Sequence, residues 1–544
     1  MSQITEQALA VENKLLDADP LSEQLSGQLA EQRANQGVGQ AGNSTSFAQR
    51  TLWLSAARLV SLVLSFLLPF ILVRKLNTAE FGLYKQAFQI LQTALGLLGL
   101  QVSGGIYSFI PRYPDKKAQV AMNAVLFYAL LGAAVALWFA LHPAWVTQAF
   151  KGGGLVPVVP LLGLAIMFWL IASAFESVMI ADNDVRRASV VTVLLQLAKT
   201  VLLVSAAVWQ GDIRTMVTAA LLFGLVHCLV FFVYLYRRLG RFWWPLDGVL
   251  FRAQLANALP FGIGAFAFSW QYDLHNYFVM HYFDAAAYAV YSTGCFQLPL
   301  LLVLLDATDT IMIPEVARLE SLGEYRRIAE TWLGAIRTLA FCFMPACALM
   351  FVMRHELIVG LYTTKLAAAT PIFAIALLNT LLLMNLTGAV MRAFEDLKFY
   401  RVKLYLCLMP VTAALLYAGV RYAGLAGVML AVVLARGLDV TLTTRRLARR
   451  IGMTRHDWHY AWPLLRIAAA ALLAALLTQI AKPLLPGGWH PLAIFMAGSL
   501  VFGLAYLPLA FAAGAVSDKE KVWLRGLLRK FDGVRARLGW PAAA

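Results

Sequence analysis

The chain has 544 residues, of which 60% are hydrophobic and 14% are charged, and its mean hydropathy is +0.70. Soluble domains average about 45–50% apolar and about 25% charged residues, so the composition excludes a water-soluble fold. The net charge of +16 does not indicate nucleic-acid binding, because the Lys and Arg residues fall between apolar runs and form no basic stripe with interleaved aromatics.

The first 46 residues are polar and mostly acidic, and they contain no apolar segment after a basic start. This pattern predicts a disordered tail and not a cleavable signal peptide. We therefore expect the first apolar segment, which begins near Leu52, to direct insertion itself. The N-terminal tail then stays in the cytoplasm.

Fourteen apolar segments follow, each long enough to cross about 30 Å of hydrocarbon. They lie near residues 51–73, 84–110, 118–141, 155–180, 189–209, 214–236, 255–283, 286–313, 328–353, 366–391, 400–420, 424–447, 463–484 and 490–514. Residues 356–370 are expected to form a short interfacial helix before the tenth segment.

The Lys and Arg residues alternate between the loops in the way that a bacterial inner-membrane protein with both termini in the cytoplasm requires. Most of the 45 fall in predicted cytoplasmic segments. A minority, among them Arg74, Lys75 and Lys85, fall in predicted periplasmic loops. The pattern favours an even number of spans.

Residues 517–544 place apolar side chains at helical spacing opposite basic ones. We expect a basic amphipathic helix lying on anionic lipid at the cytoplasmic face. A solvated helix, or a helix that docks on a partner protein, is the alternative.

No pattern indicates catalysis, a cofactor or a metal site. The five cysteines lie in apolar runs without CxxC spacing, and no GxSxG, HExxH, P-loop or Rossmann fingerprint occurs. The longest predicted periplasmic loop, about residues 354–365, is short for a membrane-embedded polymerase or ligase. We predict a protein that is not an enzyme.

Three short segments recur at an offset of roughly 200 residues, as in transporters built from repeats. Residues 77–84 match 284–291, residues 110–111 match 313–314, and residues 178–186 match 390–398. The two segments of each match lie at the same position relative to the spans of their half of the chain. The repeat therefore predicts an all-α membrane fold. In it, two six-helix lobes are related by a pseudo-two-fold axis along the membrane normal, and two additional C-terminal helices follow.

This repeat divides the chain into five parts: an N-terminal tail (1–46), an N-lobe (47–250), a C-lobe (251–455), two additional helices (456–516) and the C-terminal tail (517–544). A substrate path is expected between the lobes.

The runs LVRKLNTAEFGLYKQAFQIL, FIPRYPDKK, YFDAAAYAVYSTGCFQLP and MIPEVARL resemble those of polysaccharide-export flippases of the O-antigen type. These belong to the superfamily that also contains multidrug extruders and the peptidoglycan-precursor flippase. The resemblance covers about residues 51–450. It implies alternating-access transfer of an undecaprenyl-diphosphate-linked oligosaccharide to the periplasmic leaflet, with a polymerase and a chain-length regulator of the same pathway as partners.

Basic residues inside the predicted spans are the leading candidates for binding the anionic head group, because an ionisable residue at mid-bilayer usually faces a cavity or a partner. Arg58 and Arg337 come first, followed by Lys199 and Arg436. The alternative for Arg436 is pairing with Asp439, three residues away on the same helix face.

Acidic residues within the spans are candidates for proton or sodium coupling. Asp306 and Asp309 share a helix face, where two close carboxylates favour holding a proton between them. Pairing of Asp306 with an Arg of another span is the alternative. Glu176 is a further candidate.

The window SWQYDLHNY is unusually polar for a membrane span. Gln271, Asp273 and Asn276 are candidate sugar contacts, because sugar sites combine carboxamides with aromatic rings. His275 is a coupling candidate, although a lone histidine in such a span is more often a satisfied hydrogen-bonding group.

Two other function classes stay open. A cation-coupled multidrug exporter of the same superfamily predicts an acidic cavity, against which the basic excess argues. A non-transport subunit of a polysaccharide secretion complex is the second alternative.

Overall fold

The computed structural model describes residue 49 and residues 53–516, apart from residues 152, 241–246, 398 and 455–461. The described residues form helices and no strands, which confirms the all-α prediction. The N-terminal tail and the C-terminal amphipathic helix predicted from the sequence lie outside the described residues.

Ten helical segments of the described chain are long and apolar enough to cross a membrane, and three bent helix pairs bring the number to 13. The ten are Trp53–Lys75, Pro114–Leu141, Val156–Ala181, Val185–Trp209, Ile213–Leu239, Tyr325–Val352, Thr364–Met391, Glu395–Arg450, Trp462–Leu484 and Pro491–Ala512. They contain α5 (Lys117–Leu141), α7 (Val159–Ala172), α8 (Phe175–Ala181), α9 (Val185–Trp209), α10 (Ile213–Leu239), α14 (Tyr325–Val352), α16 (Thr370–Leu382), α17 (Thr387–Met391), α18 (Tyr400–Arg450), α19 (Trp462–Ala481) and α20 (Pro491–Ala512). The chain is therefore a multi-pass membrane protein.

Helix α18 makes two crossings, because the chain reverses direction within it. Gly424 has φ +56° and ψ −139°, a conformation outside the helical region. A Cβ atom added to Gly419 would lie 2.4 Å from the carbonyl oxygen of Gly427. Residues eight apart in a straight helix are separated by about 12 Å, so the two halves of α18 form a tight hairpin. Counting it as two crossings gives the fourteen spans predicted from hydropathy.

The three bent pairs are α3 (Thr78–Leu98) with α4 (Val102–Arg112), the two parts of α11 (Gly248–Tyr282), and α12 (Ala285–Gly294) with α13 (Pro299–Ser321). They are bent by 44°, 41° and 57°, respectively. Hydropathy predicted each as one continuous span. The break between α12 and α13 holds Cys295 and Gln297, which line the cavity described below.

The repeat is visible in how α3 and α12 begin. The side chain of Asn77 accepts a hydrogen bond from the backbone N–H of Glu80, and that of Asp284 accepts one from Ala287, each at 2.8 Å. Both are N-caps, and both helices end at a break. The two capped helices cross closely, since a Cβ atom on Gly82 would lie 1.8 Å from the carbonyl oxygen of Ala285.

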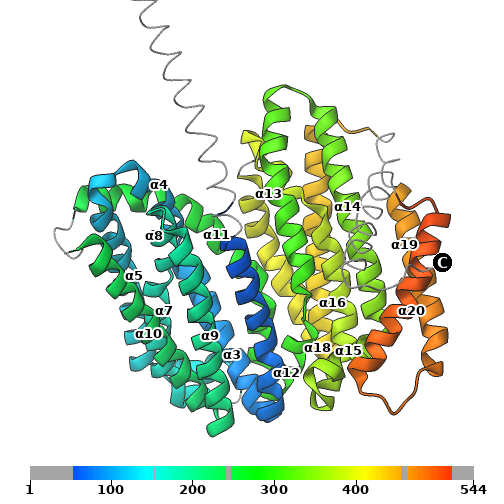
Figure 1. Ribbon diagram of the computed structural model, residues 1–544, viewed down its shortest axis with the longest axis horizontal. Coiled ribbons are helices and arrows are strands. Elements are labelled where there is room, and N and C mark those ends of the chain that lie inside the picture. The colour runs from blue at the N-terminus through cyan, green and yellow to red at the C-terminus, as the bar shows by residue number, and fades with distance from the viewer. Residues whose placement is uncertain are drawn as a thin grey trace, which may run out of the picture.

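The helices form two bundles, which approach each other at the end where α12 begins and diverge toward the end that carries α4 and α13 (Figure 1). We call the bundle from Trp53 to Leu239 the N-lobe and the bundle of α11 to α18 the C-lobe. One hydrophobic core is shared between the lobes and includes Leu76, Phe81, Val279 and Tyr288. A second core joins the C-lobe to the additional helices, and a third joins the N-lobe helices to Leu250 and Ala258 at the start of α11.

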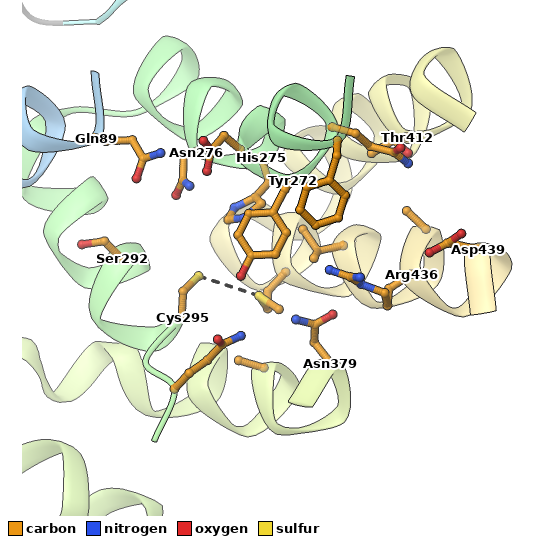
Figure 2. Close-up of a pocket in the computed structure, with 18 of the residues that line it drawn as sticks. Gln89, Tyr272, His275, Asn276, Ser292, Cys295, Asn379, Thr412, Arg436 and Asp439 are labelled. Carbon is orange, nitrogen blue, oxygen red and sulfur yellow. Dashed lines mark hydrogen bonds between the residues drawn. The ribbon is translucent and has the colours of Figure 1, made fainter. Parts of the chain in front are cut away.

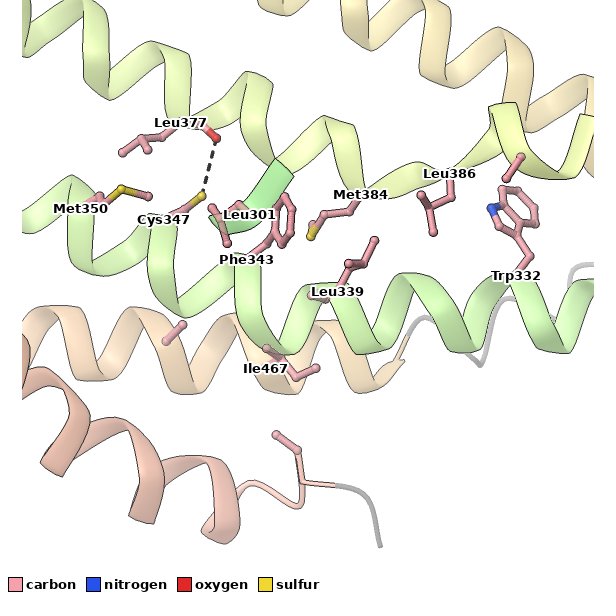
Figure 3. Close-up of a cluster of buried hydrophobic side chains, with 14 of the residues drawn as sticks. Leu301, Trp332, Leu339, Phe343, Cys347, Met350, Leu377, Met384, Leu386 and Ile467 are labelled. Atoms are coloured by element: carbon pink, nitrogen blue, oxygen red, sulfur yellow. Dashed lines mark hydrogen bonds between the residues drawn. The ribbon is translucent and has the colours of Figure 1, made fainter. Parts of the chain in front are cut away.

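The additional helices α19 and α20 pack against the outer side of the C-lobe (Figure 1). Ile467 of α19 joins the cluster that Phe343 and Cys347 of α14 form with Leu377 of α16 (Figure 3). The short helix α15 (Arg354–Tyr362) overlaps the region expected to hold an interfacial helix and contacts α20.

Candidate substrate cavity

A cavity of about 310 Å³ lies where the N-lobe helix α3 meets the C-lobe helices α11, α12, α16 and α18. Most of the residues that line it carry polar side chains, although they lie on membrane-spanning helices (Figure 2). Five carboxamide side chains reach it: Gln89, Gln271, Asn276, Gln297 and Asn379. The cavity can therefore offer many hydrogen bonds away from bulk water.

One cation comes from each lobe. Lys85 on α3 and Arg436 on α18 both line the cavity, and neither forms an ion pair with any residue that the structure describes. Arg436 lies 5.7 Å from the centroid of the Tyr272 ring, and Lys85 lies 5.5 Å from that of Phe81. Such contacts orient a cation without neutralising it.

The charge count assigned Lys85 to a periplasmic loop, at the edge of the span predicted from residue 84, and the structure corrects this by placing it inside helix α3. Helix α3 begins at Thr78, six residues before the predicted span, so Lys85 is two turns inside it. Asn77 caps the helix, and Glu80 stands three residues later, which is the spacing of a capping box. That signal was present in the sequence, but a hydropathy window passes over it because Lys85 and its polar neighbours lower the average.

Asp439 lines the same cavity as Arg436 on the second half of α18, but no ion pair joins them (Figure 2). The buried Oδ1 atom of Asp439 has no hydrogen-bond partner in the described chain, and neither do Oδ1 of Asn379, Oγ1 of Thr412 and Oε1 of Gln271. Buried polar atoms are rarely left unpaired. All four residues line the cavity.

The polar window of α11 lies on this cavity, as its sequence suggested. Asp273 accepts a hydrogen bond of 3.0 Å from the Thr93 hydroxyl, to which the Gln89 amide donates at 3.1 Å. These two hydrogen bonds link the N-lobe to the C-lobe. His275 Nδ1 lies 2.8 Å from the hydroxyl of Tyr291, so the histidine is a satisfied hydrogen-bonding group.

A family model described as a polysaccharide biosynthesis protein matches residues 71–371, which is more than half of the chain. The chain belongs to this family. No curated protein sequence matches it significantly.

Solved structures of other proteins share the fold of this chain. The structure titled "Lipid II flippase MurJ, inward closed conformation" is 14% identical, has a TM-score of 0.60 and covers 86% of this chain and 100% of its own. An inward-facing multidrug resistance MATE transporter of the MOP superfamily is 15% identical with a TM-score of 0.57, covering 72% of this chain and 94% of its own. A MOP-superfamily transporter from Pyrococcus furiosus is 15% identical with a TM-score of 0.51, covering 74% and 95%.

The family is therefore that of a polysaccharide biosynthesis protein, and at 14–15% identity the solved transporters show that the chain shares their fold.

Several candidates chosen from the sequence lie outside the cavity of this family member. Arg58 pairs with Glu176 of α8 at 2.7 Å, so a substrate candidate and a coupling candidate contact each other. Lys199 lies 5.8 Å from the Trp169 ring within the N-lobe. Arg337 donates a hydrogen bond of 3.2 Å to the carbonyl of Ala515.

The coupling candidates Asp306 and Asp309 on α13 do not line the cavity either. Asp309 is half-buried and lies near Arg392 and Arg401, whereas Asp306 is exposed. Of the candidates, the cavity brings together Arg436, Asp273, Gln271, Asn276 and His275.

The sequence interpretation missed Lys85, Gln89, Ser292, Gln297, Asn379 and Tyr405, which also line the cavity. All but Lys85 are uncharged, so the pattern of charges inside the spans does not mark them. Amides inside spans carry a similar signal, because an unpaired amide in hydrocarbon is also unfavourable.

Proposed function

We propose that the chain is a flippase that moves a lipid-linked oligosaccharide, carried on undecaprenyl diphosphate, from the cytoplasmic to the periplasmic leaflet of a bacterial inner membrane. The observation that carries the proposal is a cavity between the lobes that combines five carboxamides and several tyrosine rings with one unpaired cation from each lobe.

The lining suits a sugar. Carboxamides both donate and accept hydrogen bonds, which matches the alternating hydroxyl groups of an oligosaccharide. The rings of Tyr272 and Tyr405 offer apolar faces beside them. The oxygen atoms of Asn379, Thr412 and Gln271 that lack partners supply further acceptors.

Lys85 and Arg436 supply the contacts for the diphosphate. Charge-assisted hydrogen bonds to phosphate are strong in a site shielded from water. Because the two cations come from different lobes, a bound diphosphate would draw α3 and α18 toward each other. Asp273 and Asp439 offset the charge of the empty cavity, and Asp273 is held by Thr93.

The arrangement of the lobes supports transport by alternating access. Gly82 and Ala285 hold the lobes in close contact at the end of the molecule predicted to face the periplasm. Rocking of the lobes about this site would close the opposite end and open this one. Proton or sodium coupling and a pathway polymerase as partner belong to the same proposal.

A transport assay tests the assignment. We expect Lys85→Gln and Arg436→Gln each to reduce transfer of an undecaprenyl-diphosphate oligosaccharide across proteoliposomes at least about tenfold, because each removes one charge-assisted contact. Lys75→Gln is the matched control, since Lys75 is exposed outside the cavity. Wild-type rates in both cavity variants, or transfer of cationic dyes in place of the oligosaccharide, would refute the proposal.

A further inference from the structure

A groove between α9 and α10 lies apart from the cavity, at the end of the N-lobe predicted to face the cytoplasm. It encloses about 860 Å³ and has four arginines at its rim: Arg186, Arg187, Arg237 and Arg238. None of its lining residues reaches the central cavity. We call it the α9–α10 groove.

Two of these arginines are neutralised and two are not. Arg238 pairs with Asp182 at 2.6 Å, and Arg187 pairs with Asp184 at 3.2 Å. Arg186 and Arg237 form no ion pair with any residue in the described part of the chain. The rim therefore carries two positive charges that are free to bind an anion.

The floor of the groove is apolar and open to the lipid side. Val190 is 48% exposed and Val233 is 43% exposed. The exposed stripe continues through Leu194 on α9 and Leu229 on α10, each one helical turn further from the arginines. A hydrocarbon chain lying along this stripe would run away from the rim toward the middle of the bilayer.

Tyr234 adds a polar group to the wall. Its hydroxyl is buried and has no hydrogen-bond partner in the structure. A phenol donates one hydrogen bond and can reach a phosphate oxygen. The groove thus combines an unpaired donor, two free cations and an apolar floor.

We propose that the α9–α10 groove binds an anionic phospholipid, with its phosphate between Arg186 and Arg237 and one acyl chain along Val190 and Val233. Arginine binds phosphate through its planar fork, and basic pockets between membrane helices at the cytoplasmic face suit anionic head groups. A free phosphate would leave the apolar stripe uncovered. A zwitterionic lipid would bring an ammonium group to an already positive rim.

Native mass spectrometry of the purified full chain in detergent tests this assignment. The probes are phosphatidylglycerol and phosphatidylethanolamine with identical acyl chains. We expect the wild type to retain phosphatidylglycerol preferentially. The double variant Arg186→Gln/Arg237→Gln should bind it about tenfold more weakly, as expected when charged contacts to phosphate are lost.

The matched control is Arg445→Gln/Arg449→Gln, which removes two exposed charges from the end of α18. It should bind the lipid as the wild type does. Val190→Trp fills the floor and leaves the charges intact, so it should also weaken binding. Equal binding of both lipids, equal loss in the control, or an equal thermal shift with inorganic phosphate alone would overturn the proposal.

Discussion

The two ends of the molecule are held together in different ways. At the end where α3 and α12 begin, polar contacts run between the lobes: Arg74 donates hydrogen bonds of 3.1 Å to the carbonyls of Gly360 and Leu361. At the opposite end Arg238 pairs with Asp182 and Arg450 with Asp396 within a lobe, whereas Lys116 pairs with Asp247, which caps α11. Among the described residues, hydrogen bonds across that end involve the start of α11, where Gln254 contacts Asn123.

This difference indicates which parts move together. Each lobe is internally fastened at its open end, so it can swing as a unit, while the lobes separate only if the contacts at the closed end are broken. Substitutions at the closed end should change the conformational equilibrium. Substitutions at the open end should change the stability of one lobe and leave that equilibrium alone.

Gly82→Val should have the largest effect. Its side chain would collide with the backbone of Ala285, which cannot move aside as a side chain could. Overpacking of this kind destabilises by about 3 kcal/mol, equivalent to more than a hundredfold change in the closed population. The readout is maleimide labelling of Cys295, which lines the cavity, from the periplasmic side.

This measurement uses a background without the exposed cysteines Cys342 and Cys407. Gly437→Val is the control, because no atom beyond the neighbouring residues and backbone of its own helix lies within 4 Å of the position of its Cβ. Unchanged labelling in Gly82→Val would show that this end is not the closed gate.

Asp182→Asn should lower the free energy of unfolding by about 2 kcal/mol, since it weakens the hydrogen bonds that Lys117 and Arg238 donate at 2.7 and 2.6 Å. Labelling of Cys295 should not change. Asp184→Asn, whose partner Arg187 is 70% exposed, should cost less than about 0.5 kcal/mol. A shift in Cys295 labelling by Asp182→Asn would contradict the separation of the two ends.

The contacts of Asp182 with Lys117 and Arg238 make the stability of the N-lobe depend on pH in a predictable direction. Burial alone would raise the pKa of Asp182, but the hydrogen bonds from Lys117 and Arg238 lower it below its ordinary value. The ionised carboxylate therefore stabilises the N-lobe above about pH 4, the unfolded value, and this contribution is lost as the pH falls further. The difference between wild type and Asp182→Asn should shrink below about pH 4 in a thermal unfolding series.

Arg74→Gln should have a smaller effect at the closed end. It removes two charge-assisted hydrogen bonds from a partly exposed side chain, which corresponds to about 1 kcal/mol and a roughly fivefold rise in Cys295 labelling. Lys75→Gln is the neighbouring control. Equal labelling in the two variants would show that Arg74 does not fasten the lobes.

Arg58→Gln should have the smallest effect. Arg58 is 58% exposed and pairs with Glu176 of the same lobe, so its loss should cost less than about 1 kcal/mol. Surface polysaccharide should stay above about half of the wild-type level. Complete loss of polymer, without rescue by the exchanged pair Arg58→Glu/Glu176→Arg, would show that Arg58 contacts the substrate.

Hydropathy predicted the spans because each must satisfy its own backbone hydrogen bonds in lipid, and this requirement acts locally. The repeat was also local, since Asn77 and Asp284 cap their helices through neighbouring residues. The partner of Arg58 was not predictable in this way. Glu176 lies 118 residues further along the chain, and the two meet only through packing of the helices.

The cavity was predicted in part, for a related reason. Asp273 and Asn276 share one polar window of α11, so the sequence showed them together. Lys85 and Asn379 reach the same cavity from helices whose arrangement depends on the breaks after α3 and α12. Those breaks lie in apolar sequence and leave no mark on a hydropathy profile.

The hairpin in α18 has a practical consequence for mapping topology. With Gly419 against Gly427 and a single residue, Gly424, making the turn, the chain between the eleventh and twelfth spans leaves almost no loop outside the bilayer. The turn would therefore offer proteases and antibodies too short a segment to bind. A reporter tag inserted at this point would separate two spans that both line the cavity. An inactive reporter there would therefore reflect damage caused by the insertion and would not reveal the side of the membrane on which the turn lies.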